Sequence, residues 1–138
     1  MRNPHIGRLL RDAFARFEAE LLEGLRAAGV DDLRPTHNAV LRYLSPDGTR
    51  ASVLAERSGL TRQAVTQIVD DLEALGYVTR APDPRDRRAK LVVYTSRGLE
   101  LYETGRRVID AIEGRFEEQV GDRRYEELRR GLEAVRKR

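Results

Sequence analysis

The sequence contains no cysteine and only two histidines, His5 and His37, in 138 residues. The absence of cysteine excludes disulfides, a thiolate nucleophile, a thiol redox sensor and every zinc site that needs sulfur. Two isolated histidines do not form a metal site. The longest apolar runs are far shorter than the roughly 18 residues that a membrane span needs, and the N-terminus lacks the apolar core of a signal peptide. We therefore expect a cytoplasmic protein with no cofactor, no metal and no membrane partner.

The residue patterns that most enzymes need are missing as well. The sequence has no histidine paired with a nucleophile, no glycine-rich phosphate loop and no metal-ligand spacing. Its 23 acidic residues leave acid–base carboxylates open, but none of them sits in an evident cleft. At about 100–200 residues per domain, the length fits one domain without a separate cofactor module. We expect a single-domain protein that is not an enzyme.

Positive charge is concentrated in two segments, although the formal net charge of the whole chain is only +3. Residues 80–90 hold five basic and two acidic side chains, and residues 123–138 hold seven basic and three acidic ones. The other two segments, 1–79 and 91–122, are slightly acidic. A concentrated basic segment attracts a polyanion, although a single charge run is more often a solvated loop or helix end.

The spacing of apolar residues predicts a mainly helical fold. Apolar side chains at steps of three and four predict helices over residues 3–29, 35–44, 51–58 and 61–76.

The period changes after Gly76. The β-branched and aromatic runs at 77–79 and 91–94 predict a hairpin whose long basic tip is residues 80–90. Helical spacing then returns from Thr95 to Gly121, and a last helix begins at Asp122. The predicted order is four helices, a hairpin and two helices.

Residues 54–61 have the features of a tight turn between two short helices that cross steeply. Ala55 is small where the backbones approach, and Gly59 can adopt a positive φ where the chain reverses. Val65, on the next helix, can fill the space between them. Because a basic hairpin follows, this combination predicts a winged helix-turn-helix. A winged helix with a purely structural role is the alternative.

The helix after Thr61 carries side chains suited to reading DNA. Arginine can pair with guanine and glutamine with adenine, each worth about 1–3 kcal/mol of discrimination, and threonine can touch a thymine methyl or a phosphate. Acidic residues appear only in the later turns, beginning at Asp70. The predicted DNA-binding residues of this helix and its N-cap are Thr61, Arg62, Gln63, Thr66 and Gln67.

Two other binding functions compete with sequence-specific regulation. A winged-helix protein-interaction module would be expected to lack Arg62, Gln63 and Thr66 on the exposed face, together with the arginine-rich hairpin. A non-specific nucleic-acid-binding module would keep the basic charge without discriminating among sequences. A gel shift with and without competitor DNA separates these alternatives from the leading interpretation, a sequence-specific DNA-binding regulator.

The run from Asp83 to Gly98, DPRDRRAKLVVYTSRG, resembles the wing signature of the MarR (multiple antibiotic resistance regulator) family of bacterial transcription factors. Residues 54–61 and the flanking long helices resemble the same family, so the resemblance covers essentially the whole chain. It implies a homodimer with interlaced terminal helices and two winged helices on a palindromic operator in double-stranded DNA. It also implies repression that a small phenolic or anionic ligand relieves.

The resemblance divides the single domain, residues 1–138, into parts and assigns roles within the wing. Residues 1–30 and 96–138 are expected to form dimerisation helices around a winged helix-turn-helix at 35–95.

Arg87, together with Arg85, is expected at the wing tip and in a minor groove, where narrow A·T-rich segments concentrate negative potential. Asp86 and Arg88 are expected to brace the wing, with Arg88 able to pair with Asp70. Arg88 is therefore interpreted either as a bracing or as a DNA-contacting residue.

The family's ligand cleft lies where the dimerisation helices meet the winged helix. His37 and Tyr102 could line such a cleft in this chain. A capping or surface role is the more common one for a histidine in this position, and a core role for such a tyrosine. The lack of cysteine excludes the oxidant sensing that some family members perform through a reactive thiol.

The length of the first helix predicts a dimer independently of the family. A helix of about 26 residues is roughly 39 Å long at 1.5 Å per residue, longer than a domain of this size can cover with its own core. A palindrome whose half-sites lie about 34–36 Å apart suits a two-fold dimer, and an intramolecular helical bundle is the alternative. The apolar residues expected to need a partner are Leu9, Leu10, Phe17, Ile112, Phe116, Leu128 and Leu132.

Overall fold

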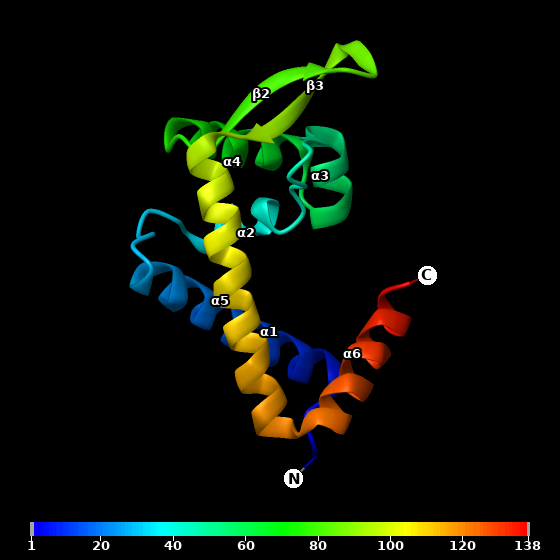
Figure 1. Cartoon of the computed structure of the whole chain (residues 1–138). Helices are drawn as coiled ribbons and strands as arrows, with labels where there is room; N and C mark the ends of the chain where they lie inside the picture. The colour runs from blue at the N-terminus through cyan, green and yellow to red at the C-terminus, as the bar shows by residue number, and fades with distance from the viewer. Residues whose placement is uncertain (1, 138) are drawn as a thin grey trace.

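A computed structural model describes residues 2–137, and over this part the chain forms six helices and three short strands (Figure 1). In chain order the elements are α1 (Ile6–Ala27), α2 (Pro35–Leu41), β1 (Thr49–Arg50), α3 (Ala51–Ser58), α4 (Arg62–Ala74), β2 (Val78–Asp83), β3 (Asp86–Tyr94), α5 (Ser96–Val120) and α6 (Asp122–Arg136). The predicted fold class, mainly α with a winged helix-turn-helix, is confirmed. None of the described helices is long and apolar enough to span a bilayer.

Residues 35–95, which we call the winged unit, enclose most of the core. β3 lies between β1 and β2 in an antiparallel sheet, and α2, α3 and α4 pack beside it (Figure 1). Val40, Leu54, Val65 and Leu72 have no exposed surface. They come from the three helices at helical spacing, so one apolar face of each helix is enough to close this core.

The turn between α3 and α4 has the predicted local chemistry. Gly59 ends α3 with a φ of 73°, a left-handed conformation that glycine adopts without steric cost. Thr61 then caps α4, and its hydroxyl accepts a hydrogen bond from the Ala64 N–H at 3.0 Å. These two local signals set the steep crossing that presents α4 at the surface.

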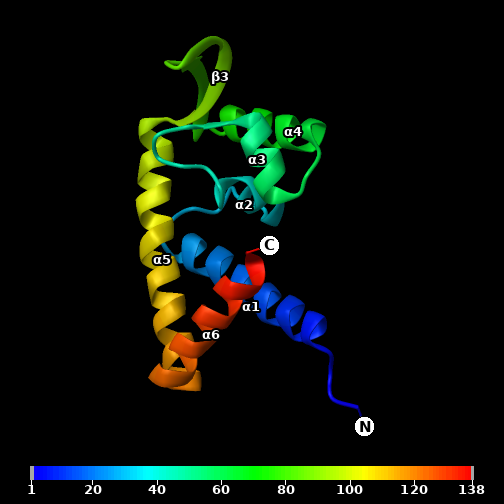
Figure 2. The ribbon, with the colours of Figure 1, turned by 90° about the vertical axis from the view of Figure 1, so that its right-hand side faces the viewer.

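The long helix α5 runs from the wing to the opposite end of the molecule (Figure 2). Helix α1 crosses the C-terminal half of α5, and α6 folds back from its far end. Arg115 of α5 donates to Glu20 of α1 at 3.1 Å, and the Arg16 guanidinium of α1 lies 5.0 Å from the Phe116 ring centroid. Ile112 lies on α5 one turn before these contacts and is completely buried within the chain. The expectation that Ile112 needs a partner chain was therefore wrong, because α1 already covers it.

Several element boundaries differ from the sequence prediction. The first helix begins at Ile6 rather than residue 3, because His5 is its N-cap and its Nδ1 accepts the Arg8 N–H at 3.2 Å. The strands of the hairpin extend to Asp83 and back from Asp86, so the predicted long tip is mostly strand. The two-residue strand β1 was not predicted, since its pairing with β3 joins positions about 40 residues apart.

Candidate nucleic-acid interface and adjoining cavity

The outer face of α4 gathers the polar side chains that the sequence predicted for DNA recognition. Val65, Val69 and Leu72 occupy the inner face and are buried. The Thr66 hydroxyl donates back to the Arg62 carbonyl oxygen at 2.9 Å, which leaves its methyl group and lone pairs for an outside partner. Thr61, Arg62, Gln63, Thr66 and Gln67 are all exposed. The helix thus presents a continuous surface of donors and acceptors with no acidic residue in its first two turns.

The wing tip contains an irregularity that exposes its arginines. β2 and β3 stay in register as far as the pair Pro82 and Lys90, after which Asp83 faces Asp86. Residues 87–89 are therefore extra on β3, as in a β-bulge. The three wing arginines at this point, Arg85, Arg87 and Arg88, are exposed.

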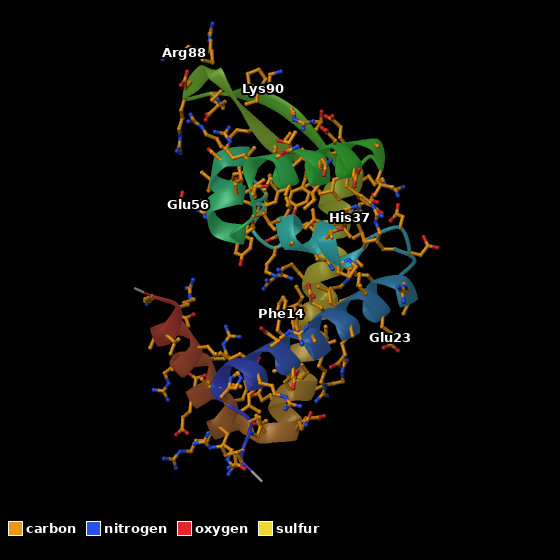
Figure 3. The ribbon with its side chains drawn as sticks, turned by 180° about the vertical axis from the view of Figure 1, so that it is seen from behind. Phe14, Glu23, His37, Glu56, Arg88 and Lys90 are labelled. Carbon is orange, nitrogen blue, oxygen red and sulfur yellow. The ribbon has the colours of Figure 1, made fainter. Side chains whose placement is uncertain are left out.

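Arg88 stands out from the tip of the wing, away from the helices (Figure 3). Its side chain is 94% exposed, and its Nε lies 3.4 Å from Oδ1 of Asp86, its neighbour on the same strand. The expected pairing of Arg88 with Asp70 was wrong, because Arg88 projects from the far end of the hairpin. Arg88 and Asp86 contact each other within the tip, and their expected role in bracing the wing stays a prediction.

Arg80 is the residue that joins the wing to α4. Its guanidinium Nη2 lies 2.7 Å from Asp70 Oδ1, and its Nη1 lies 2.9 Å from Glu73 Oε1. Asp70 and Glu73 are three residues apart on α4 and thus share one face. The sequence held a signal for this contact, an acidic pair at helical spacing followed by an arginine near the start of the next strand. Arg80 therefore offsets acidic charge on α4 and adds little to the free positive charge of the wing.

A second ion pair ties the base of the wing tip to the start of α3. Arg50 Nε lies 2.7 Å from Asp83 Oδ2, and the backbone N–H of Arg85 donates to Asp83 Oδ1 at 2.9 Å. The Arg85 N–H and the Arg50 guanidinium together hold the pKa of Asp83 below its usual value. Asp83 is nearly inaccessible, at 4% exposure, so both of its oxygens are committed to these contacts. The pair fixes the direction in which the hairpin leaves the winged unit.

A cavity of about 480 Å³ lies between the winged unit and the long helices. Its apolar wall includes Phe17, Leu21 and Leu25 of α1 and Leu101 of α5. Its size falls within the roughly 300–1,000 Å³ of small-molecule sites, which are also mostly apolar with a few polar groups. The described residues can therefore enclose a small organic ligand.

Three tyrosines, Tyr43, Tyr94 and Tyr102, and three arginines add polar character to this cavity. The rings of Tyr94 and Tyr102 lie 5.7 Å apart between centroids. Burial raises the pKa of Tyr94, so its hydroxyl stays protonated and donates to the Leu44 carbonyl oxygen at 3.3 Å.

Of the arginines, Arg42 is held by Glu18 at 3.0 Å. Arg57 and Arg106 form no ion pair with any residue from 2 to 137.

The structure separates the two residues that the sequence suggested for a ligand cleft. Tyr102 lines the cavity, whereas His37 is absent from its wall. His37 is instead a buried capping residue, because its Nδ1 accepts the Arg34 N–H at 3.0 Å at the start of α2. Its Nε2 lies 3.7 Å from Asp71 Oδ2 on α4 (Figure 3). Sequence reasoning missed the next residue, Asn38, which is 5% exposed and does line the cavity.

A tight junction connects the winged unit to α5. The Tyr77 hydroxyl donates to Asp32 Oδ1 at 2.5 Å, and Arg97 Nη2 donates to Asp32 Oδ2 at 2.8 Å. Burial raises the pKa of Tyr77, and the hydrogen bond to Asp32 raises it further. Gly98 packs against the Tyr77 carbonyl oxygen so closely that a β-carbon would overlap it. The first turn of α5 is therefore held firmly against the end of α4.

The terminal helices leave an apolar surface uncovered. Over its described residues, 122–136, α6 buries no side chain. Phe17 and Phe116, two of the residues expected at a dimer contact, are half-buried between α1 and α5. Four others are exposed by 41–49%, namely Leu9, Leu10, Leu128 and Leu132.

Two short helices joined by a tight turn, an exposed polar face on the second helix and a basic hairpin after it define a winged helix-turn-helix protein of the DNA-binding class. Residues 31–89 match the model of the MarR family.

Similar structures cover nearly the whole chain. The crystal structure of CouR from Rhodococcus jostii RHA1 bound to p-coumaroyl-CoA is 30% identical, with a TM-score of 0.76, and covers 94% of this chain and 90% of that one. A MarR-family regulator from Rhodococcus sp. RHA1 is 29% identical, with a TM-score of 0.75, and covers 94% and 91%. The chain belongs to the MarR family. The proteins of this family are transcriptional regulators and not enzymes.

A further relative is the transcriptional activatory protein BadR of Rhodopseudomonas palustris. It is 34% identical over 84 residues, which are 58% of this chain and 48% of BadR. This chain thus spans about half the length of BadR in that alignment.

Proposed function

We propose that this MarR-family regulator works as a homodimeric repressor that binds a palindromic operator and releases it when a phenolic or anionic ligand binds. The exposed polar face of α4 beside the arginine-bearing wing carries this proposal. A surface with a protein-interaction role alone has no need of Arg62, Gln63 and Gln67 grouped in the first turns of one helix. Base edges in a major groove do require such side chains.

Each predicted DNA-binding residue of α4 and of the wing has a role in the proposed complex. Arg62, Gln63 and Gln67 contact base edges, and Thr66 contacts a thymine methyl or a phosphate. Thr61 and the free N–H groups behind it face a phosphate at the N-terminus of α4. Arg85 and Arg87 enter the adjacent minor groove, where narrow A·T-rich DNA attracts arginine.

Within the wing, Asp86 and Arg88 stabilise the bulged tip and Arg88 also lies within reach of DNA. Arg80, paired with Asp70 and Glu73, holds the wing at its angle to α4.

The exposed apolar surface of the terminal helices supports the homodimer. Leu128 and Leu132 are four residues apart on α6, and Leu9 and Leu10 are neighbours on α1. Packing against a second copy removes the exposed apolar surface of all four from water. A C2 dimer places two copies of α4 on one side of the molecule, about one helical turn of DNA apart, as a palindrome requires. Residues 1–30 and 96–138 form the dimerisation region in this proposal, with the winged unit at 35–95.

The cavity supports regulation by a small molecule. It lies where α1 and α5 meet the winged unit, so an occupant touches both parts of the chain. Its apolar wall, its three tyrosines and the two arginines that have no ion pair within residues 2–137 suit an aromatic acid or its coenzyme A thioester, the type of ligand seen in the CouR structure. A ligand that binds more tightly to the conformation unable to bind the operator increases the fraction of protein in that conformation, and the protein leaves the DNA.

A gel shift with the DNA upstream of the chain's own gene tests the DNA-binding part. We expect a retarded band that survives excess unrelated DNA. Arg62→Ala should weaken this binding by about 1–3 kcal/mol and relax the preference at one base pair. Arg107→Ala, an exposed arginine on α5, is the matched control and should leave specificity unchanged. A band that any DNA competes away equally would instead indicate non-specific binding, and no band at all would refute DNA binding at this region.

A further inference from the structure

Two buried side-chain polar atoms lack a hydrogen-bond partner within residues 2–137, and they belong to neighbours on α2. They are Nε2 of His37 and Nδ2 of Asn38. The Nε2 atom of His37 still lies 3.7 Å from a carboxylate oxygen of Asp71. The Nδ2 atom of Asn38 has no such polar neighbour among the described residues. A buried amide that makes no hydrogen bond destabilises the fold, because it loses its bonds to water without replacement. The Asn38 amide therefore needs a hydrogen-bond partner that the described residues do not supply.

The position of Asn38 indicates where its partner would come from. Asn38 lines the cavity and is 5% exposed. Around it, the wall is apolar, with Leu33 and Leu41 close in sequence and Leu21 and Leu25 from α1. A carboxamide carries two donor hydrogens and an acceptor oxygen and can hydrogen-bond a ligand hydroxyl in either sense. Other polar residues line this cavity, but among them Asn38 is the buried one, so it determines which ligand atom can lie at the buried end.

The charged side chains of the cavity lie at its exposed edge. Arg57 on α3 and Arg106 on α5 are exposed and line the cavity, in contrast to the buried Asn38. A ligand with an anionic group and an uncharged end is therefore oriented with the anion beside the arginines and the uncharged end inside. Ser45, another polar lining residue, already accepts the Asp47 N–H at 3.3 Å.

We propose that Asn38 is the specificity-determining residue of this cavity, hydrogen-bonding the phenolic hydroxyl at the buried end of an aromatic anion whose charged end lies beside Arg57 and Arg106. This inference rests on the proposed ligand-responsive function. The anion is a carboxylate or the phosphates of a coenzyme A thioester, both of which are negatively charged. Since α2 also contacts α4 through His37 and Asp71, a ligand held by Asn38 acts on the helix that carries the recognition residues.

Calorimetric titration of the full chain with two matched probe pairs tests the inference. The pairs are p-coumaroyl-CoA with cinnamoyl-CoA, and p-coumarate with cinnamate, which differ only in the phenolic hydroxyl. We expect the hydroxylated member of at least one pair to bind at least about tenfold more tightly, because a site built to bond a hydroxyl rejects the analogue without it. The pair that binds identifies the source of the anion.

Asn38→Leu should abolish this discrimination and leave the melting temperature equal or higher, because leucine fills a similar volume without an unsatisfied amide. Asn38→Ala provides a second variant with the same expected loss of discrimination. Ser45→Ala is the matched control and should retain it.

Three outcomes would overturn the inference. In the first, Asn38→Leu keeps the preference for the hydroxylated probe. In the second, both Asn38 variants lower the melting temperature and weaken both members of a pair equally, as a purely structural residue would. In the third, the wild-type chain binds none of the four probes. Operator binding is measured on the same samples without ligand. Normal operator binding in these samples would show that only the ligand inference has failed, and not the proposed DNA-binding function.

Discussion

The winged unit and the terminal helices differ in how much of their apolar surface the chain covers by itself. Val40, Leu54 and Val65 in the winged unit have no exposed surface. In contrast, α6 buries none of its residues, and Leu128 is 49% exposed. The winged unit therefore closes its own core, while the terminal helices carry apolar faces that need additional surface. This contrast is the physical basis for assigning DNA contact to one region and self-association to the other.

The two basic segments of the chain each contain paired and unpaired arginines. In the wing, Arg85 and Arg87 form no ion pair with any residue from 2 to 137. On α6, Arg123 pairs with Glu127 at 3.4 Å and Arg129 with Glu113 at 3.0 Å. Arg124 and Arg136 on α6 form no ion pair with any residue from 2 to 137 either, so both segments keep some free positive charge. The wing differs in position, because its free arginines follow directly after the helix with the exposed polar face.

The largest expected effect comes from placing charge on the uncovered face of α6. The double substitution Leu128→Asp and Leu132→Asp should yield a monomer by light scattering, since two carboxylates cannot be buried against an apolar partner. Operator affinity should fall by about 10²–10⁴-fold, because the second half-site is no longer bound intramolecularly. Ala134→Asp, on the opposite face of α6, should leave the dimer intact. A double variant that stays dimeric and binds DNA normally would show that this face is not the interface.

An intermediate effect is expected where the two regions join. Gly98→Ala forces a methyl group onto the Tyr77 carbonyl oxygen and should destabilise the chain by about 1–3 kcal/mol or more. Gly105→Ala, on the same helix, meets nothing within 4 Å and should stabilise it by about 0.5–1 kcal/mol through better helix propensity. Chemical denaturation measures both variants. Equal effects of the two substitutions would argue against a tight junction at Gly98.

The smallest effect expected is a difference in salt dependence between the two basic segments. Arg87→Ala should weaken operator binding and reduce the slope of log K against log salt by about one, as expected for the loss of one phosphate-region contact. Arg130→Ala on α6 should leave the slope unchanged, because Arg130 lies beside Glu126 at 3.8 Å and far from the proposed interface. Circular dichroism should show an intact fold for both. Unchanged affinity of Arg87→Ala would refute the wing-tip assignment.

Much of the fold could be predicted because its signals are local. The bounds of α3, residues 51–58, and the turn at Gly59 follow from apolar spacing and from one glycine with a positive φ. The cap at Thr61 and the exposed polar face of α4 depend only on neighbours within a few residues. The fold class and the mixture of helices and hairpin were predictable for the same reason.

Contacts between distant segments were not predictable in this way. The pairing of Asp70 with Arg80, rather than Arg88, depends on where the hairpin crosses α4. The burial of Ile112 depends on the path of α1 across α5, and the orphan amide of Asn38 depends on walls from several elements. Periodicity marks a residue as apolar or polar but does not say which segment will cover it.

The sequence by itself determined the order of the helices and of the hairpin, the exposed polar face of α4 and the concentration of arginine in the wing. These properties arise from side chains that are neighbours along the chain, where spacing and caps act over one or two turns. Only the tertiary structure decided which charges are free, which apolar faces stay open and which polar side chain lines the cavity. Those properties require segments tens of residues apart to meet, and their packing removes some groups from water while leaving others exposed.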